Sequence, residues 1–298
     1  MHAPVLLEET IAALALKEGD FAVDGTLGSG GHAEAILRRI GALGRLLGVE
    51  WDEHALMRAR TRLASPAGLR PRENPRNTIF VHGSYADLPS ILAREKLPKA
   101  DALLLDLGFS SDQLEESGRG FSFLRDEPLD MRYDTREGET AAELIARASV
   151  TDLARIFREY GEERQAEKFA GAVTAAKRRG PIRTSGALAK VITDAVGGRG
   201  RIHPATKVFM ALRIAVNHEF ENIRTVLERL PEVVRAGGRV AVITFHSLED
   251  RVVKKTFRAL AKEGIVRILT KHVVKPSRAE VLANPRSRSA KLRALQIL

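Results

Sequence analysis

The stretch AVDGTLGSGGH, residues 22–32, leads from apolar residues into an acid and then into a turn that carries four glycines. Glycines at such a turn let the backbone approach a ligand closely, and the following helix presents its N-terminus to that ligand. Gly28 to Ala33 matches the pattern G-x-G-x-x-[GA]. Glu50 follows about 20 residues later, where a ribose-binding acid is expected. The pattern predicts a nucleotide-cofactor site and leaves the cofactor itself open.

Short apolar runs alternate with helix-period segments on both sides of this turn. Near-continuous apolar strands separated by helices imply a parallel sheet that is covered on both faces. We therefore predict an α/β, Rossmann-like fold with a mostly parallel, seven-stranded sheet. The predicted strands are 20–24, 45–50, 78–82, 100–107, 239–245, 266–271 and 292–298, and the predicted helices include 32–41, 53–64, 86–96 and 248–263.

The connection between the fourth and fifth predicted strands is far longer than a crossover requires. It holds about 130 residues, whereas a parallel crossover needs about a dozen. A helix that begins at Pro204 is expected to supply the crossover, because proline suits the first turn of a helix. The remaining residues of this connection, 110–203, are predicted to form an inserted all-helical subdomain for substrate recognition. The cofactor-binding domain is then discontinuous, over 1–109 and 204–298.

The composition excludes several classes of protein. The 298 residues are 44% hydrophobic and 29% charged, which is typical of a globular chain with a proper core. Cysteine is absent, so we expect no disulfide, no thiolate metal site and no cysteine nucleophile, and we predict no metal. Acids at Glu8 and Glu9 argue against a signal peptide. No apolar run approaches the roughly 20 residues of a membrane span, and we expect a cytoplasmic protein.

The net charge points to a polyanionic partner. The chain has 48 Lys and Arg against 38 Asp and Glu, a net charge of +10. Seven of the basic residues fall between Lys271 and Leu298, against the single acid Glu280. A solvated basic face is one explanation of such a run. Because the whole chain is basic, we favour binding to nucleic acid.

Asp24 favours one cofactor over another. A dinucleotide places its pyrophosphate beside the helix N-terminus, where a carboxylate would repel it. S-adenosylmethionine carries an ammonium and a sulfonium, and acids at the strand ends favour both cationic centres. The alternative is that Asp24 only caps the following turn. On charge we predict S-adenosylmethionine, with an NAD-dependent dehydrogenase as an alternative.

Two strand ends bring further polar residues to the cofactor. In open parallel sheets the ligand lies beyond the carboxyl ends of the strands, where Asp106 and His246 are expected. Methylation of a pyrimidine at carbon 5 needs a covalent nucleophile, normally a thiolate, and this chain has none. An exocyclic amine or a ribose hydroxyl can attack the methyl directly if an acceptor aligns it. Asp106 is a candidate for that acceptor, or it serves the cofactor.

Residues 118–132, GRGFSFLRDEPLDMR, are candidates for binding the substrate. Arg119, Phe121 and Arg132 have the chemistry to stack on a base and to contact phosphate. The alternative is that the phenylalanines of this segment belong to the core of the insert.

Seven blocks of the sequence, in the same order, resemble the bacterial 16S ribosomal RNA (cytosine-N4)-methyltransferases, the small-subunit methyltransferase H family. The resemblance covers nearly the whole chain. It implies a class I S-adenosylmethionine-dependent methyltransferase fold. It also implies transfer of a methyl group to N4 of a cytidine in the decoding centre, the P-site region, of 16S rRNA. The blocks are HAPVLLEE at 2–9, DGTLGSGGH at 24–32, DLGFSSDQL at 106–114, RGFSFLRDEPLDMR at 119–132, HPATKVFMALRIAVNHE at 203–219, GGRVAVITFHSLEDR at 237–251 and NPRSRSAKLR at 284–293.

The resemblance also assigns cofactor contacts, to which the charge argument adds Asp24. The family usually has Asp at position 50 and Phe at position 85, so the Glu and Tyr of this chain change the reach of two contacts. By position, the implied contacts fall on Gly30, Gly31, His32, Glu50, Tyr85, Asp106 and Gln113.

A rim of Asp106, Asn217 and His246 is predicted to hold the cytidine, and these three are the candidate catalytic residues. The unperturbed pKa of histidine, about 6.5, makes His246 a candidate proton acceptor, with a structural role as the alternative. We expect 16S rRNA or the small ribosomal subunit as the partner, and the sequence leaves a homodimer open.

Two alternatives remain outside nucleotide-cofactor enzymes. GFSSD at 108–112 imitates a nucleophile elbow with Ser110 as nucleophile and His246 as base, but Asp112 stands where the elbow needs glycine. The charge alone is also compatible with a non-enzymatic RNA-binding protein.

Overall fold

The computed structural model describes residues 4–64, 77–108, 117–196 and 203–298. The chain divides into two compact units. We call residues 1–108 with 220–298 the sheet unit and residues 109–219 the insert unit. Within the described ranges, no helix is both long enough and apolar enough to cross a membrane.

The sheet unit contains a seven-stranded sheet with the order β3-β2-β1-β4-β5-β7-β6. The strands β1 to β5 pair in parallel, whereas β7 runs antiparallel to both of its neighbours. The predicted α/β class with a mostly parallel, seven-stranded sheet is confirmed. The strands are β1 (Phe21–Asp24), β2 (Arg45–Glu50), β3 (Thr78–His82), β4 (Ala100–Asp106), β5 (Val234–Thr244), β6 (Val266–Ile268) and β7 (Lys291–Ile297).

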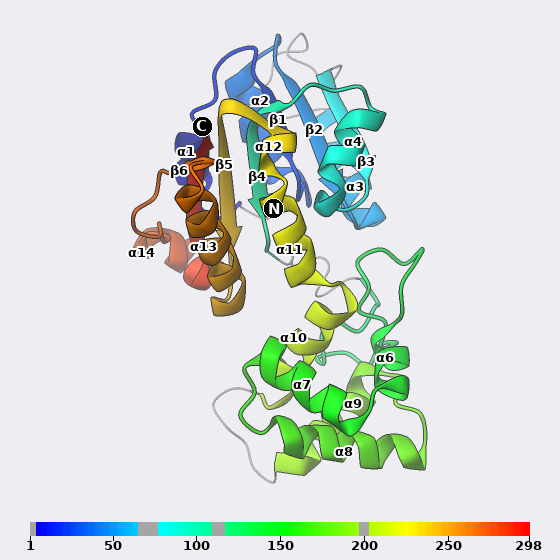
Figure 1. Ribbon diagram of the computed structural model, residues 1–298. Helices are drawn as coiled ribbons and strands as arrows, with labels where there is room; N and C mark the ends of the chain where they lie inside the picture. The colour runs from blue at the N-terminus through cyan, green and yellow to red at the C-terminus, as the bar shows by residue number, and fades with distance from the viewer. Residues whose placement is uncertain (1–3, 65–76, 109–116, 197–202) are drawn as a thin grey trace. The chain divides into compact units, whose positions relative to one another are not determined.

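Helices cover both faces of this sheet, which is why its central strands are apolar at nearly every position. On one face α1 (Leu7–Leu14), α2 (Gly31–Ile40) and α3 (Glu53–Ala64) share a core with the strands. Figure 1 shows α11, α12 and α13 on the opposite side of the sheet from α2. The remaining helices of this unit are η2 (Tyr85–Asp87), α4 (Leu88–Arg94), α11 (Glu219–Glu228), α12 (Leu230–Val233), α13 (Ser247–Lys262), α14 (Arg278–Ala283) and η3 (Pro285–Ser289).

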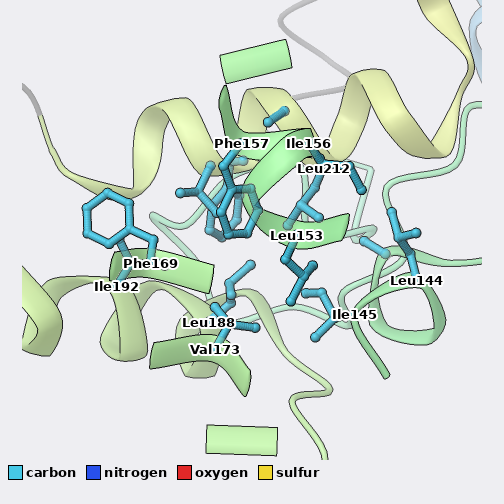
Figure 2. Packing of buried hydrophobic residues seen from close by; sticks show 14 of the residues in the cluster. Leu144, Ile145, Leu153, Ile156, Phe157, Phe169, Val173, Leu188, Ile192 and Leu212 are labelled. Carbon is cyan, nitrogen blue, oxygen red and sulfur yellow. The ribbon is translucent and has the colours of Figure 1, made fainter. Parts of the chain in front are cut away.

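The insert unit is helical and has a hydrophobic core of its own. Thr140 and Ser149 begin its first two helices with capping boxes, in which side chain and backbone satisfy each other. Figure 2 shows Phe157, Phe169 and Leu212 meeting in the core from three different helices. The helices are α6 (Ala141–Arg147), α7 (Val150–Gly161), α8 (Ala166–Arg179), α9 (Ser185–Val196) and α10 (Ala205–Val216).

Helix α10 belongs to the insert unit, so this unit extends beyond the boundary at 203/204 that the sequence suggested. The apolar face of α10, which includes Val208 and Phe209, is buried in the insert core. The helix ends at Asn217, and His218 has a left-handed backbone with φ 50°. The crossover to β5 is therefore made by α11 and α12, and the expectation that the helix at Pro204 makes it is corrected.

Candidate functional site

Three acids end neighbouring strands of the sheet. Because β1 lies between β2 and β4, Asp24, Glu50 and Asp106 meet at one edge. His32, in the first turn of α2, completes the group. Asp24, Glu50 and His32 are buried, and Asp106 is 22% exposed. The structure thus brings together four of the predicted site residues.

The glycine turn between β1 and α2 has the conformation that its sequence predicts. Gly28 and Gly30 have φ values of 52° and 82°, in the left-handed region that side chains other than glycine disfavour. Helix α2 begins at Gly31 with Gly30 as its N-cap, so no side chain caps the first turn. The positive end of the helix dipole is left open toward an anionic ligand group.

Asp24 uses only one of its two carboxylate oxygens within the protein. Its Oδ1 accepts a hydrogen bond from the backbone N–H of Thr26 at 3.1 Å. Its Oδ2 is buried and has no hydrogen-bond partner among the described residues. Burial raises the pKa of Asp24 to about 7, although nearby His32 acts to lower it. Asp24 therefore caps the turn, as one interpretation predicted, and keeps a second oxygen that no described residue satisfies.

His32 and Asp106 form a close pair. Nε2 of His32 lies 3.4 Å from Oδ2 of Asp106. Burial alone would lower the pKa of His32, but the carboxylates of Asp106 and Asp24 outweigh it and raise that pKa. Oδ1 of Asp106 is buried without a partner in the described part of the chain. The backbone of Asp106 is fixed by its N–H, which donates to Oγ1 of Thr26 at 2.6 Å.

Glu50 joins the second strand to the glycine turn. Its Oε2 accepts a hydrogen bond from the N–H of Gly28 at 2.7 Å, and its Oε1 accepts one from Asp52 at 3.0 Å. Burial raises the pKa of Glu50. Each carboxylate oxygen has a second lone pair, so the two backbone bonds leave acceptor capacity for a ribose diol.

An aromatic pair lies beside this edge. The ring of Tyr85 stacks on that of Trp51, with centroids 5.4 Å apart and an angle of 23° between the planes. Tyr85 is buried, and Trp51 directly follows Glu50. The pair has the apolar surface that packing against an adenine requires.

His246 lies at the end of the neighbouring strand β5, as N-cap of α13. Its Nε2 is 2.8 Å from Oε1 of Glu249, and its Nδ1 accepts from the N–H of the same residue at 3.3 Å. Both ring nitrogens thus face groups of the first turn of α13. Nδ1 thus has the structural role of capping α13, whereas Nε2 makes no hydrogen bond among the described residues, and its role as proton acceptor stays a prediction.

Asn217 lies in the insert unit, where its side-chain amide bonds to backbone groups. Its Oδ1 accepts from the N–H of Tyr133 at 2.8 Å. Its Nδ2 donates to the carbonyls of Met131 at 2.8 Å and Arg213 at 2.9 Å. Met131 is buried with a left-handed φ of 62°, so Asn217 holds a strained backbone in place. Its predicted place on the substrate rim stays a prediction.

The three predicted substrate-binding residues make contacts within their own segment. Arg119 donates to the carbonyls of Arg132 and Tyr133. Arg132 pairs with both carboxylate oxygens of Asp130, at 2.7 and 2.9 Å. Phe121 is buried in the insert core and stacks on Tyr133 at 5.6 Å, as the core alternative predicted. Their roles toward RNA stay predictions, as do those of Gln113 and Ser110, which lie outside the described residues.

Comparison with known proteins places the chain in a family. The family model for MraW methylases matches residues 1–298. The chain belongs to the MraW methylase family. It is 42% identical to a ribosomal RNA small subunit methyltransferase H from Desulfosudis oleivorans over 99% of this chain and 98% of that protein. Its identity to the protein of the same name from Syntrophotalea carbinolica is 44%, over 100% of this chain and 98% of the relative.

A solved structure of an rRNA methylase from Streptococcus thermophilus aligns with this methylase at 11% identity and a TM-score of 0.41, over 98% of this chain and 92% of that one. A likeness at this level adds nothing to the family relationship. Membership in the family confirms the prediction of a methyltransferase and of S-adenosylmethionine as its donor. It decides against the dehydrogenase, the hydrolase and the non-enzymatic RNA-binding protein.

The residues of the methylase fit this donor. Oδ2 of Asp24 and Oδ1 of Asp106 are buried acceptors without partners among the described residues. Buried polar atoms are nearly always hydrogen-bonded, so two such oxygens at one edge are suited to a ligand with donors or positive charge. A diphosphate would meet the same oxygens with like charge.

Two residues at this edge, Trp51 and Thr26, are not among the predicted site residues. Trp51 is the single tryptophan of the chain and directly follows the predicted ribose-binding acid. This position in the sequence already indicates a place beside the cofactor. Thr26 carries no such signal. Its Oγ1 ties the turn after β1 to Asp106, and only the pairing of β1 with β4 reveals that contact.

Proposed function

We propose that this methylase transfers a methyl group from S-adenosylmethionine to N4 of a cytidine in the decoding centre of 16S rRNA. The full-length relatives named as small-subunit rRNA methyltransferases support an rRNA substrate. The seven sequence blocks support the cytidine N4 position. The net charge of +10 supports a polyanionic partner. Because its substrate is ribosomal, we expect the protein to act in the cytoplasm.

The contacts of the two carboxylate oxygens of Asp106 give this proposal its main support. One oxygen faces His32 at 3.4 Å, and the other is buried without a partner among the described residues. An exocyclic amine offers N–H donors, and a fixed acceptor at the strand end can align that amine for attack. The proposal therefore assigns this role to Asp106.

When bound, S-adenosylmethionine supplies an electrophilic methyl group on a positively charged sulfur. Asp24 and Asp106 keep negative potential at the edge where the positive charge is bound. Glu50 positions the glycine turn and accepts from a ribose hydroxyl. Asp106 accepts a hydrogen bond from the N4 amine and takes up the proton that the amine loses after attack. His246 caps the first turn of α13.

The test is an assay with 16S rRNA from a bacterial strain that lacks its own N4-cytidine methyltransferase. The purified protein and S-adenosylmethionine should yield N4-methylcytidine at one position, measured by mass spectrometry of the digested nucleosides. Asp106→Asn, which keeps the size of the side chain, serves as the matched control and should yield none. A methyl group on carbon 5 or on the ribose would overturn the proposed position, and an unmethylated rRNA would overturn the substrate.

A further inference from the structure

The insert unit contains a cavity that no step above uses. Its volume is about 610 Å³. Its walls are Ala142, Glu143, Ile145 and Ala146 of α6 and residues 177–183, which run from the last turn of α8 into the next loop. We call it the basic cavity. It lies wholly within the insert unit.

The basic cavity carries more positive than negative charge. Arg178, Arg179 and Arg183 are exposed and form no ion pair among the described residues. Other arginines of the same unit are paired, such as Arg132 with Asp130. The one acid of the lining, Glu143, accepts from the N–H and the hydroxyl of Thr140 and so serves the capping box. Three guanidinium groups at one cavity are thus left for an outside anion.

The floor of the cavity is apolar and fixed in the core. Ile145 and Ile182 are buried, and Figure 2 shows Ile145 among the packed residues of the insert. Lys177 also belongs to this fixed part. Its Nζ donates to the carbonyls of Ile145 and Ala146 at the end of α6, at 2.8 and 3.1 Å, so its charge is already satisfied.

Helix stability alone does not explain the three arginines. Basic residues in a last turn stabilise a helix through its dipole, which accounts for Arg178 and Arg179 in α8. Arg183 lies beyond Gly180 and Pro181, outside the helix, and still lines the cavity. All three arginines line the cavity, but only two of them lie in the last turn of the helix.

We infer that the basic cavity binds one nucleotide of single-stranded RNA, with its phosphates on Arg178, Arg179 and Arg183 and its base on the apolar floor. Guanidinium groups bind phosphate in a planar, two-pronged geometry. Apolar side chains that pack on the face of a base form no hydrogen bond with its edge, so this contact is tolerant of sequence. The inference rests on the proposed rRNA substrate and adds a docking point in the insert unit.

The first test replaces Arg178, Arg179 and Arg183 together by glutamine. The matched control replaces Arg155, Arg158 and Lys190, which are exposed on α7 and α9 and pair with acids of the same unit. Both variants lose the same charge. We expect the cavity variant to raise the KM for rRNA about tenfold with kcat nearly unchanged. The logarithm of the RNA-binding constant should also depend less steeply on the logarithm of salt concentration. Each lost phosphate contact lowers this slope by roughly 0.7, so the loss of three contacts should lower it by about 2. The control should change neither.

The outcomes separate the two proposals. If the wild-type protein methylates rRNA and the cavity variant matches the control in KM and salt slope, the basic cavity is not a docking site. If the wild-type protein does not methylate rRNA, the proposed function fails. Thermal unfolding of each variant checks that the insert unit, which holds all the substitutions, is folded.

A second variant tests entry into the cavity. Ala146→Trp places a large side chain at an exposed position of the wall. We expect it to raise the KM for rRNA while it leaves the salt slope unchanged. An unchanged KM would show that no nucleotide enters, and would overturn the inference even if the arginines bind phosphate.

Discussion

Nε2 of His32 lies 3.4 Å from Oδ2 of Asp106, so the first turn of α2 and the end of β4 are joined by a charged contact. The same contact raises the pKa of His32 against the effect of its burial. The other oxygen of Asp106, Oδ1, is buried and has no hydrogen-bond partner among the described residues.

Asp106→Asn should abolish methyl transfer while the protein stays folded. The amide keeps the shape of the side chain but removes the negative charge and the capacity to take up a proton. We expect kcat to fall by a factor of about 100 or more, which is the usual scale of general acid–base catalysis. Single-turnover measurement of methyl transfer to rRNA gives the value. A rate and a donor affinity that both match the wild type would remove Asp106 from the mechanism.

Asp24 should make the stability of the donor-free protein depend on pH. Burial raises its pKa from 3.8 to about 7, against the influence of His32, while Asp106 and Glu50 add to the rise. An acid whose pKa is higher in the folded state contributes stability that is fully present below its unfolded pKa and is lost as the pH rises through the folded value. The loss is at most about 1.4 kcal/mol per pH unit.

Asp24→Asn removes this titration and tests it. The melting temperature of the variant, relative to the wild type, should increase as the pH rises from about 4 to about 7 and level off above. Scanning calorimetry without donor at a series of pH values measures the difference. A difference that is constant across this window would contradict the raised pKa.

Glu50→Gln should weaken both the fold and the binding of the donor. The carboxylate accepts from the N–H groups of Gly28 and Asp52, and an amide presents an N–H₂ to one of these two donors. An unsatisfied buried donor costs about 1–3 kcal/mol, and we expect the free energy of unfolding to fall by that amount. Urea denaturation and calorimetric titration with S-adenosylmethionine measure the two effects. An unchanged midpoint would mean that the carboxylate does not hold the turn.

Asn217→Ala should act on stability more than on donor binding. It leaves the N–H of Tyr133 and the carbonyl of Met131 without their partner, which should reduce the free energy of unfolding by about 1–3 kcal/mol. The donor site lies in the other unit, so the affinity for S-adenosylmethionine should stay constant. Thermal unfolding and calorimetry together give the answer. A loss of kcat without loss of stability would restore Asn217 to the substrate rim.

The sheet was predictable because its strands are apolar runs with clear polar ends. The bounds of β2 and β3 match the predicted 45–50 and 78–82. Strand β5 begins earlier than predicted, at Val234, because that residue pairs with Ala100 across a register shift. No local pattern in RAGG indicates this pairing, which depends on the neighbouring strand.

Contacts between side chains could not be predicted, because a sequence pattern gives the chemistry of each residue and not its partner in the fold. Arg132 has the chemistry to bind phosphate, but Asp130 already pairs with it. Helix α10 has an apolar face that suits either unit, and only the packing of Val208 and Phe209 assigns it to the insert. Asp24 was predictable, since an acid between a buried strand and a glycine turn must lie at the sheet edge.

If a buried carboxylate beside the glycine turn holds the cationic methyl donor, the loss of its charge must weaken donor binding, which calorimetric titration of S-adenosylmethionine measures. The titration compares the wild type with Asp24→Asn at pH 8, where the wild-type carboxylate is ionised. We expect the variant to bind the donor at least about tenfold more weakly, a difference of about 1.4 kcal/mol. Equal affinities in the two proteins would contradict it.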